Sequence, residues 1–313
     1  MTTMIVEDKR EPLVSVLMNC YNGEKYLREA LDSVLAQTYQ NWELIFWDNQ
    51  STDNSRAILE EYLPNERIRY FYAPIHTNLG GGRAAAWEYI RGDYLCVLDV
   101  DDYMLPNKVA LQVQHLEENE DVGVSISNTL FFSDRFEEKL YSVPPRIDLG
   151  LQYLIRKYYV SLESTMISMK HARKLQEGFS SEYSHIADFD LIVRVCSISK
   201  ISYLDAVLSG WRVHKNSGTW LESHRFNIEI IKWCDSRIEL PEFKEVYDDI
   251  SFRRKRAYFE NLMFDASKLS FRELFKLNSA STSKLYLALG LMFLPFYNAL
   301  SKYRTLRFQK KWW

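Results

Sequence analysis

Short apolar runs alternate with segments of helical periodicity over the first 110 residues, and this alternation limits the fold more than any other feature. The apolar runs are too short for helices and predict strands at 14–20, 42–47, 68–73 and 94–98. Helices are expected at 24–36, from a cap at Thr52 or Asp53 to about 62, at 83–91, and from Pro106 to about 118. Strands that are apolar on both faces and alternate with helices are typical of a mostly parallel central sheet with helices on both faces.

The pattern loosens beyond residue 121. Strands are expected at 122–132, 165–169 and 201–213, and a capped helix at 188–197. After about residue 223 the chain becomes helical, basic and aromatic. We therefore expect an α/β domain over 1–220, with halves at about 12–105 and 106–220, followed by a helical C-terminal region at 221–313.

Composition excludes several classes of protein. With 313 residues, 47% of them hydrophobic, the chain has ample material for a packed core, which excludes wholesale disorder. Its 39 Lys and Arg against 42 Asp and Glu give a net charge of −3, so nucleic acid is not an expected partner. Residues 1–12 are polar and acidic and lack the apolar core of a secretory signal, so a cytoplasmic location is expected. The oligomeric state is not determined by these features.

Polar clusters follow three of the expected strands. They are 19–22 (Asn-Cys-Tyr-Asn), Asp48-Asn49 and 99–102 (Asp-Val-Asp-Asp). The carboxyl ends of parallel strands lie at one edge of a sheet, where open α/β sheets bind their ligands. Asn and Asp also favour strand ends and helix caps for purely structural reasons, but three clusters at one edge favour a site.

The acidic turn at 99–102 carries three carboxylates in four residues. They repel one another unless a cation lies among them. Mg²⁺ prefers one or two carboxylates together with substrate phosphates, so a divalent cation with a phosphate ligand would suit this turn. The alternative is a solvated acidic turn that caps a helix.

A glycine-rich segment, 78–83 (Asn-Leu-Gly-Gly-Gly-Arg), enters the predicted helix at 83–91. Backbone N–H groups at a helix N-terminus suit a diphosphate, so Gly80 and Arg83 are candidate contacts for one. The segment matches the dinucleotide pattern G-x-G-x-x-A, but six residues separate it from the preceding strand, whereas that pattern needs a tight turn. A nicotinamide-dependent oxidoreductase is therefore disfavoured, and the absence of a G-x-x-x-x-G-K-[ST] motif disfavours a P-loop enzyme.

These segments, taken in order, resemble a known family. The matching stretches are Pro12 to Gly23, Tyr26-Leu27, 33–39 (SVLAQTY), 42–48 (WELIFWD), 51–53 (STD), 92–102 (GDYLCVLDVDD), Pro106, 188–194 (DFDLIVR) and 211–214 (WRVH). They resemble the family 2 glycosyltransferases, which are inverting, nucleotide-sugar-dependent enzymes of the GT-A fold. The resemblance covers roughly residues 12–219. It implies a GT-A domain whose nucleotide-binding half is 12–105 and whose acceptor half is 106–220.

The resemblance also implies roles for single residues. Tyr21 would lie against the nucleobase, and Asp48 would accept hydrogen bonds from it. Asp99 would hold the ribose, and Asp101 would bind a divalent cation, Mg²⁺ or Mn²⁺. Asp188 would be the catalytic base, although an Asp there could be only a helix N-cap. The family's pattern further implies that His214 approaches the metal or the diphosphate, with a structural histidine as the alternative.

Three departures from the family pattern bear on these roles. Asn49 and Gln50 stand where the family usually has Asp and Gly, Ala85 and Ala86 replace the usual Arg-Asn, and Ala187 replaces a common Glu. They leave open a nucleotide-sugar-binding protein of the same fold without turnover. The main expectation is an inverting transferase that moves a sugar, with a UDP-sugar as the expected donor, to a glycan or lipid-linked glycan acceptor. A glycoside hydrolase needs two carboxyl groups but no diphosphate site, so the nucleotide-side cluster disfavours it.

The chain ends in an apolar segment, 284–300, and a basic aromatic one, 302–313. The first contains Pro295 and is shorter than the roughly 20 residues that span a bilayer. Cations interleaved with Tyr and Trp suit an anionic membrane surface. We therefore expect peripheral contact with the inner face of the cell membrane, with a helix packed on the catalytic domain as the alternative.

Overall fold

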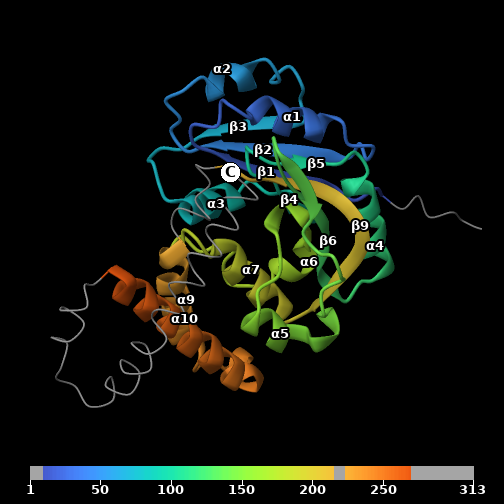
Figure 1. Cartoon of the computed structure of the whole chain (residues 1–313). Helices are drawn as coiled ribbons and strands as arrows, with labels where there is room; N and C mark the ends of the chain where they lie inside the picture. The colour runs from blue at the N-terminus through green and yellow to red at the C-terminus, as the bar shows by residue number, and fades with distance from the viewer. Residues whose placement is uncertain (1–9, 215–222, 269–313) are drawn as a thin grey trace, which may run out of the picture. The chain divides into compact units, whose positions relative to one another are not determined.

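The computed structural model describes residues 10–214 and 223–268, and the chain forms two compact units (Figure 1). The first unit comprises 1–131, 138–154 and 158–212, and the second comprises 132–137, 155–157 and 213–313. Each unit is described by itself. The apolar segment at 284–300 and the basic tail at 302–313 lie outside the described residues.

The first unit is built on a mixed sheet. Its strands are β1 (Val14–Cys20), β2 (Trp42–Asp48), β3 (Ile68–Tyr72), β4 (Tyr94–Val97), β5 (Tyr103–Met104), β6 (Val122–Ser133), β7 (Phe136–Lys139), β8 (Thr165–Ser168) and β9 (Lys200–Arg212). In the described part of the chain they run in the order β3-β2-β1-β4-β8-β6-β9-β5, and β7 pairs with β6. β3, β2, β1 and β4 are parallel, as predicted. β8 then pairs antiparallel with both β4 and β6, and β5 pairs antiparallel with β9.

Helices cover the sheet. They are α1 (Leu27–Leu35), α2 (Ser55–Glu60), α3 (Leu79–Trp87), α4 (Lys108–Glu118), α5 (Gly150–Arg156), α6 (Met169–Ala172) and α7 (Ala187–Cys196), with short 3₁₀ turns η1 (Ile147–Leu149) and η2 (Leu162–Ser164). The N-cap of α2 is Asn54, so the predicted cap at Thr52 or Asp53 was wrong, although Asp53 accepts from the backbone nitrogen of Ser55 at 2.9 Å. The prediction for α3 was wrong: the helix begins four residues earlier than expected, because Asn78 caps it by accepting from the Gly81 nitrogen at 2.7 Å.

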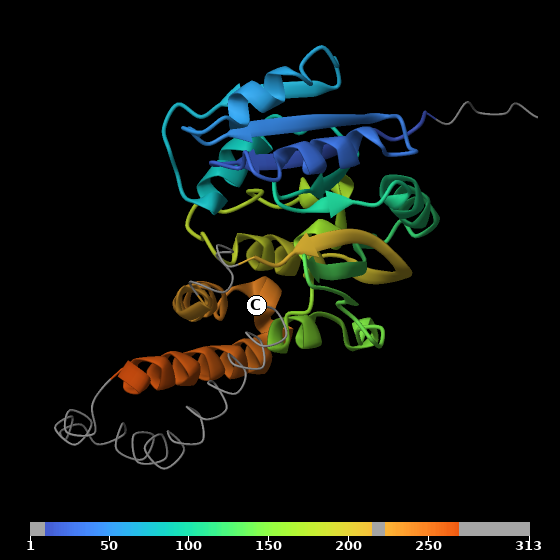
Figure 2. The same cartoon turned by 45° about the horizontal axis from the view of Figure 1, so that its top comes forward.

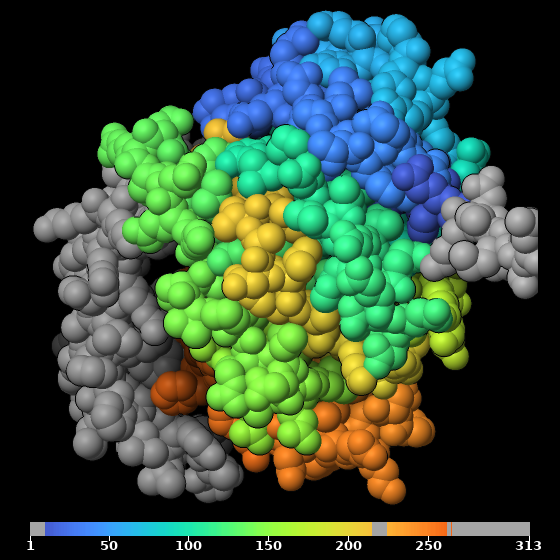
Figure 3. All heavy atoms as spheres, turned by 90° about the vertical axis from the view of Figure 1, so that its right-hand side faces the viewer, coloured from blue at the N-terminus to red at the C-terminus, as the bar shows by residue number. Residues whose placement is uncertain are grey.

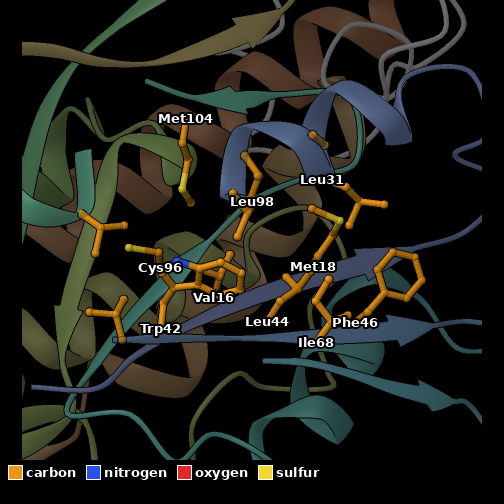
Figure 4. Close-up of a cluster of buried hydrophobic side chains, with 14 of the residues drawn as sticks. Val16, Met18, Leu31, Trp42, Leu44, Phe46, Ile68, Cys96, Leu98 and Met104 are labelled. Carbon is orange, nitrogen blue, oxygen red and sulfur yellow. The ribbon is translucent and has the colours of Figure 1, made fainter. Parts of the chain in front are cut away.

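One hydrophobic cluster lies on one face of the parallel strands, and residues of the other face, such as Leu17 and Ile45, are buried as well. Alternate residues of β1, among them Val16 and Met18, pack with Leu44 and Phe46 of β2 and with Leu31 of α1 (Figure 4). Residues that alternate with these, such as Asn19, face the other side of β1, where the ideal Cβ position of Gly82 on α3 lies 2.8 Å from Asn19 Oδ1. The two sides of β1 therefore hold α1 and α3, and both helices adjoin the edge where β1 ends.

β9 is long and curved (Figures 1 and 2). On the face shown in Figure 3 it lies beside α4, where His115 Nε2 and Ser202 Oγ are 2.8 Å apart. Its far end pairs with β5, which follows the acidic turn directly, through Gly210 opposite Tyr103. β9 therefore brings its last residues to the acidic turn.

The second unit is helical over residues 223–268. It contains α9 (Ser223–Arg237), η3 (Pro241–Val246) and α10 (Tyr247–Lys268). Trp233 and Phe243 pack edge to face, with ring centroids 5.7 Å apart, and both are fully buried. Among the described helices of the chain, none has both the length and the apolar character that crossing a bilayer requires.

Candidate active site

The predicted site residues at the ends of β1 and β2 lie at one edge of the sheet. The parallel register places Cys20 beside Asp48, and Asp48 beside Tyr72. The turn after β4 begins level with them, because the Leu98 nitrogen donates to the Leu17 carbonyl at 3.0 Å. The sequence thus brings Tyr21, Asp48 and the acidic turn to the same edge.

Tyr21 and Asp48 are held by the loops around them. The Tyr21 ring is 52% exposed and lies 4.4 Å, centroid to centroid, from the ring of His76, which the sequence analysis did not single out. Asp48 is buried and accepts from the Ser51 nitrogen at 2.7 Å and from the Tyr70 hydroxyl at 3.1 Å. Burial, and then Asp48, raise the pKa of Tyr70 to about 12, so its hydroxyl remains a donor at neutral pH.

Asn49 has a structural role at this edge. Its side chain donates to the Thr77 carbonyl at 2.7 Å and accepts from the Thr77 nitrogen at 3.2 Å. Its carbonyl oxygen lies 2.8 Å from Nδ1 of His76. Asn49, which differs from the family pattern, therefore stabilises the loop that carries His76 through hydrogen bonds.

The glycines of segment 78–83 allow close packing. A Cβ on Gly80 would lie 1.8 Å from the Tyr183 carbonyl oxygen and 2.9 Å from that of Ser180, and one on Gly82 would meet Asn19. The segment is the first turn of α3 rather than a loop before a helix. The contact of Gly80 with a diphosphate stays a prediction, and it would have to use the side of the glycine away from these carbonyls.

Arg83 joins α3 to the acidic turn. Its side chain is nearly fully buried, and Nη2 donates to Oδ1 of Asp99 at 2.6 Å. Its buried Nε has no hydrogen-bond partner in the part of the chain that the structure describes. Asp99 keeps 39% of its side chain exposed, so this carboxylate both holds the arginine and faces solvent.

Arg212, at the end of β9, holds the other side of the turn. Its backbone nitrogen donates to Oδ1 of Asp102 at 2.8 Å, and its Nε donates to the Asp101 carbonyl at 2.9 Å. Its guanidinium also pairs with Glu29 and lies 4.4 Å from the ring centroid of Tyr26. The family-like segment at 211–214 drew attention to this region, but the sequence did not indicate that Arg212 contacts the turn.

The buried carboxyls beside the turn are hard to ionise. Burial, followed by the charges of Asp101, Glu163 and Asp99, raises the pKa of Asp102 well above its ordinary value. Glu163, in η2, is also buried, and burial raises its pKa although the Ser161 hydroxyl donates to it at 2.5 Å. Nothing in the local sequence singled out Glu163, because the fold alone brings it near the turn.

Asp188 lies in the first turn of α7. The N-cap of that helix is Ile186, so the alternative prediction, in which Asp188 is the N-cap, was wrong. Oδ2 of Asp188 accepts from the Tyr158 hydroxyl at 3.1 Å. Burial raises the pKa of Asp188, and the positive charge of Arg83 opposes the rise. Arg83 therefore bears electrostatically on Asp188 while it holds Asp99.

The remaining predicted contacts concern a metal ion. Asp101 is partly exposed at the turn, whereas His214 follows β9 and belongs to the second compact unit, so its approach to the turn stays a prediction. In residues 10–214 and 223–268, no group of three or more His, Cys, Asp or Glu side chains is arranged to hold a metal ion. A cation bound by Asp101 together with substrate phosphates would have the coordination that Mg²⁺ prefers.

Comparisons with known proteins point to one family. Residues 15–179 match the family model described as glycosyl transferase family 2. An uncharacterized glycosyltransferase of Rickettsia typhi is 33% identical over 220 residues, which are 65% of this chain and 64% of that protein. The UDP-Glc:alpha-D-GlcNAc-diphosphoundecaprenol beta-1,3-glucosyltransferase WfgD of Escherichia coli is 26% identical over 216 residues, 68% of this chain and 81% of that protein.

A solved structure is similar to this one. The crystal structure of S. aureus TarS 1-349 in complex with UDP-GlcNAc has a TM-score of 0.64 and 18% identity, and the match covers 90% of this chain and 80% of that one. This likeness confirms the expected GT-A fold, and the family match confirms the resemblance seen in the sequence.

Proposed function

Because the chain belongs to glycosyl transferase family 2, we propose that it is a metal-dependent inverting glycosyltransferase. It would move a hexose from a UDP-sugar to a hydroxyl group of a glycan or lipid-linked glycan. Residues 1–220 would form the catalytic domain. The printed names of WfgD and of the TarS complex, both of which refer to UDP-sugars, support the donor class, and that of WfgD supports a lipid-linked acceptor.

One observation carries this proposal. Arg83 is paired with Asp99 of the acidic turn and at the same time bears on the charge of Asp188. In a sugar transfer, the bond to the leaving diphosphate breaks as the bond to the acceptor oxygen forms. The diphosphate and the general base that deprotonates the acceptor hydroxyl must therefore lie close together. The pairing of Arg83 with Asp99 and its influence on the charge of Asp188 support such an arrangement.

The turn fits a divalent cation. Asp101 is partly exposed at the turn, and, as the family resemblance implies, it would hold the ion together with phosphate groups of the donor and with His214. When bound, such a cation supplies Lewis-acid stabilisation of the charge on the leaving nucleoside diphosphate. Arg212 would keep the Asp101 peptide in position for it.

The donor's nucleoside would lie at the ends of β1 and β2. Tyr21 offers an exposed aromatic face on which a base can stack, with His76 beside it. Asp48 would accept hydrogen bonds from the base, and the exposed part of Asp99 would accept from the ribose hydroxyls.

Asp188 would act as the general base. It accepts the proton of the acceptor hydroxyl while that oxygen forms its bond to the anomeric carbon, and the bond from that carbon to the diphosphate oxygen breaks. A single displacement of this kind inverts the anomeric configuration. General-base help contributes about 10²–10⁴ in rate, and fixed positions for both substrates contribute to the remainder.

The transfer is tested by donor turnover with and without EDTA. Purified protein is incubated with UDP-sugars and Mg²⁺ or Mn²⁺, and free UDP is measured with and without a glycan acceptor. We expect metal-dependent release of UDP. Saturable binding of a UDP-sugar in calorimetry, with no turnover on any donor and acceptor offered, would instead support a binding protein of the same fold.

We also propose that the C-terminal region contacts the inner face of the cell membrane. The basic and aromatic residues at 302–313 support this. Truncation after Ser283 should release the protein from anionic liposomes in a sedimentation assay, and continued sedimentation of the truncated protein would contradict the proposal.

A further inference from the structure

Tyr158 is held between two neighbours from α7. Its hydroxyl donates to Oδ2 of Asp188 at 3.1 Å. Its ring packs edge to face on the ring of Phe189, with centroids 5.2 Å apart and planes at 78°. These two contacts fix both the hydroxyl and the ring of the tyrosine against the first turn of the helix.

We propose that Tyr158 is a positioning residue for the general base. By donating to Oδ2, it would hold the Asp188 carboxylate in one orientation and leave lone pairs on Oδ1 to accept from the acceptor hydroxyl. The inference rests on the proposed role of Asp188 and adds a residue that acts through it. Tyr158 lies 30 positions before Asp188 in the chain, on a separate segment.

Charge supports this geometry. Burial, and then the negative charge of Asp188, raise the pKa of Tyr158 well above its ordinary value, so the hydroxyl stays protonated and donates. Burial raises the pKa of Asp188, while the charge of Arg83 and the hydrogen bonds from Tyr158 and the backbone lower it. The charges of Tyr141 and Cys196 also raise the pKa of Tyr158.

Loss of the Tyr158 hydroxyl therefore has a predictable sign. A hydrogen bond to the ionised carboxylate favours that form, so its removal raises the pKa of Asp188. The base then needs a higher pH to lose its proton. A merely structural tyrosine would change stability without moving the pH at which the base ionises.

The chain offers a matched control in the next residue. Within residues 10–214 and 223–268, the buried Tyr159 hydroxyl has no hydrogen-bond partner. The Tyr159 backbone carbonyl accepts from the Tyr141 hydroxyl, and a Phe side chain leaves that bond unaffected. Tyr158→Phe and Tyr159→Phe thus remove the same atom from adjacent positions, and only one of the two hydroxyls contacts Asp188.

The experiment measures steady-state sugar transfer by the full chain with Tyr158→Phe, Tyr159→Phe and Asp188→Asn, across about pH 5–9. We expect Tyr158→Phe to lower kcat by about 10- to 100-fold, because the free energy of a hydrogen bond to a charged group corresponds to a factor of about that size. Its acid limb should move to higher pH, with the donor KM unchanged. Tyr159→Phe should match the wild type in all three measurements, and thermal unfolding confirms that each variant is folded.

The outcomes separate this inference from the proposed function. If Asp188→Asn abolishes transfer while Tyr158→Phe keeps the wild-type acid limb, Tyr158 does not position the base, whatever happens to kcat. If Asp188→Asn retains full transfer, Asp188 is not the base, and the roles of both residues are overturned. If no variant, nor the wild type, turns over any donor, the proposed function itself fails.

Discussion

Nη2 of Arg83 lies 2.6 Å from Oδ1 of Asp99, and this ion pair joins the first turns of helix α3 to the acidic turn that follows β4. The arginine is nearly fully buried, whereas the carboxylate is partly exposed. A cation is thus fixed inside the protein, next to the place where the proposed reaction would release a diphosphate. Arg83 is therefore the natural first target for mutation.

Arg83→Gln should weaken donor binding and shift the pH profile. Loss of the charge-assisted hydrogen bond frees Asp99, and we expect the Kd for UDP-sugar to rise by about 10-fold or more. Because Arg83 lowers the pKa of Asp188, its loss raises that pKa, so the acid limb of the transfer rate should move to higher pH. Calorimetry and a pH–rate profile measure the two effects.

Arg69→Gln is the control for this variant. Arg69 pairs with Glu43 at 2.8 Å near the opposite end of β2, and both side chains are mostly buried. Its loss should lower stability and leave donor affinity unchanged. Equal donor affinity in wild type and Arg83→Gln would remove Arg83 from the donor site.

Asp188→Asn should separate activity from stability. We expect transfer to fall by at least about 10² with donor binding near normal. Burial raises the pKa of Asp188, so its ionised form costs folding free energy at neutral pH, and the neutral Asn should leave the Tm unchanged or slightly higher.

Asp190, two residues along α7, provides the contrast. It is fully buried and paired with Arg194 at 2.5 Å, and Arg194 also donates to the carbonyls of Glu177 and Gly178. Asp190→Asn should destabilise the fold by about 3 kcal/mol, since it leaves a buried charge without its partner. A loss of stability in Asp188→Asn as large as that would assign Asp188 a structural role.

Gly80→Ala should strain the contact between α3 and the segment before α7. The added Cβ would lie 1.8 Å from the Tyr183 backbone carbonyl, which cannot move without shifting the chain that leads to Asp188. We expect a net loss of about 1–2 kcal/mol, as overpacking exceeds the gain in helix propensity. A fall in kcat should accompany it.

Gly81→Ala adds the same methyl group one position away. Its nearest neighbours would be Cβ and Oγ1 of Thr77 at 3.0 and 3.1 Å, so a shift of only a few tenths of an ångström would relieve the contact. Thermal unfolding of the two variants compares them directly, and similar Tm values would show that the carbonyl contact at Gly80 is easily relieved.

Arg212→Lys should weaken the response to metal. The backbone bond from residue 212 to Asp102 survives, but the single ammonium group cannot replace both the Nε bond to the Asp101 carbonyl and the pair with Glu29. Residues that orient a metal ligand change its affinity by about 10- to 100-fold. We therefore expect transfer to require at least about tenfold more Mg²⁺ or Mn²⁺. Arg28→Lys, which alters an exposed pair with Glu61, should leave the metal requirement unchanged.

Local pattern was enough to predict where the strands lie. β1, β2, β3 and β4 agree with their predicted ranges to within one residue, because a buried parallel strand needs a short run of apolar side chains. The start of α3 was predicted wrongly, since three consecutive glycines suggested a loop and the cap from Asn78 was not recognised.

The amino-acid sequence by itself determined the family, the parallel strands and the edge at which Tyr21, Asp48 and the acidic turn meet, since these depend on side-chain periodicity and on motifs a few residues long. Only the tertiary structure decided the contacts that give this edge its chemistry. Arg83 with Asp99, Tyr158 with Asp188, and Arg212 with Asp102 are 16, 30 and 110 positions apart. Their distances depend on how strands and helices pack, and the packing also determines the burial that shifts each carboxyl pKa, so no local pattern in the chain encodes them.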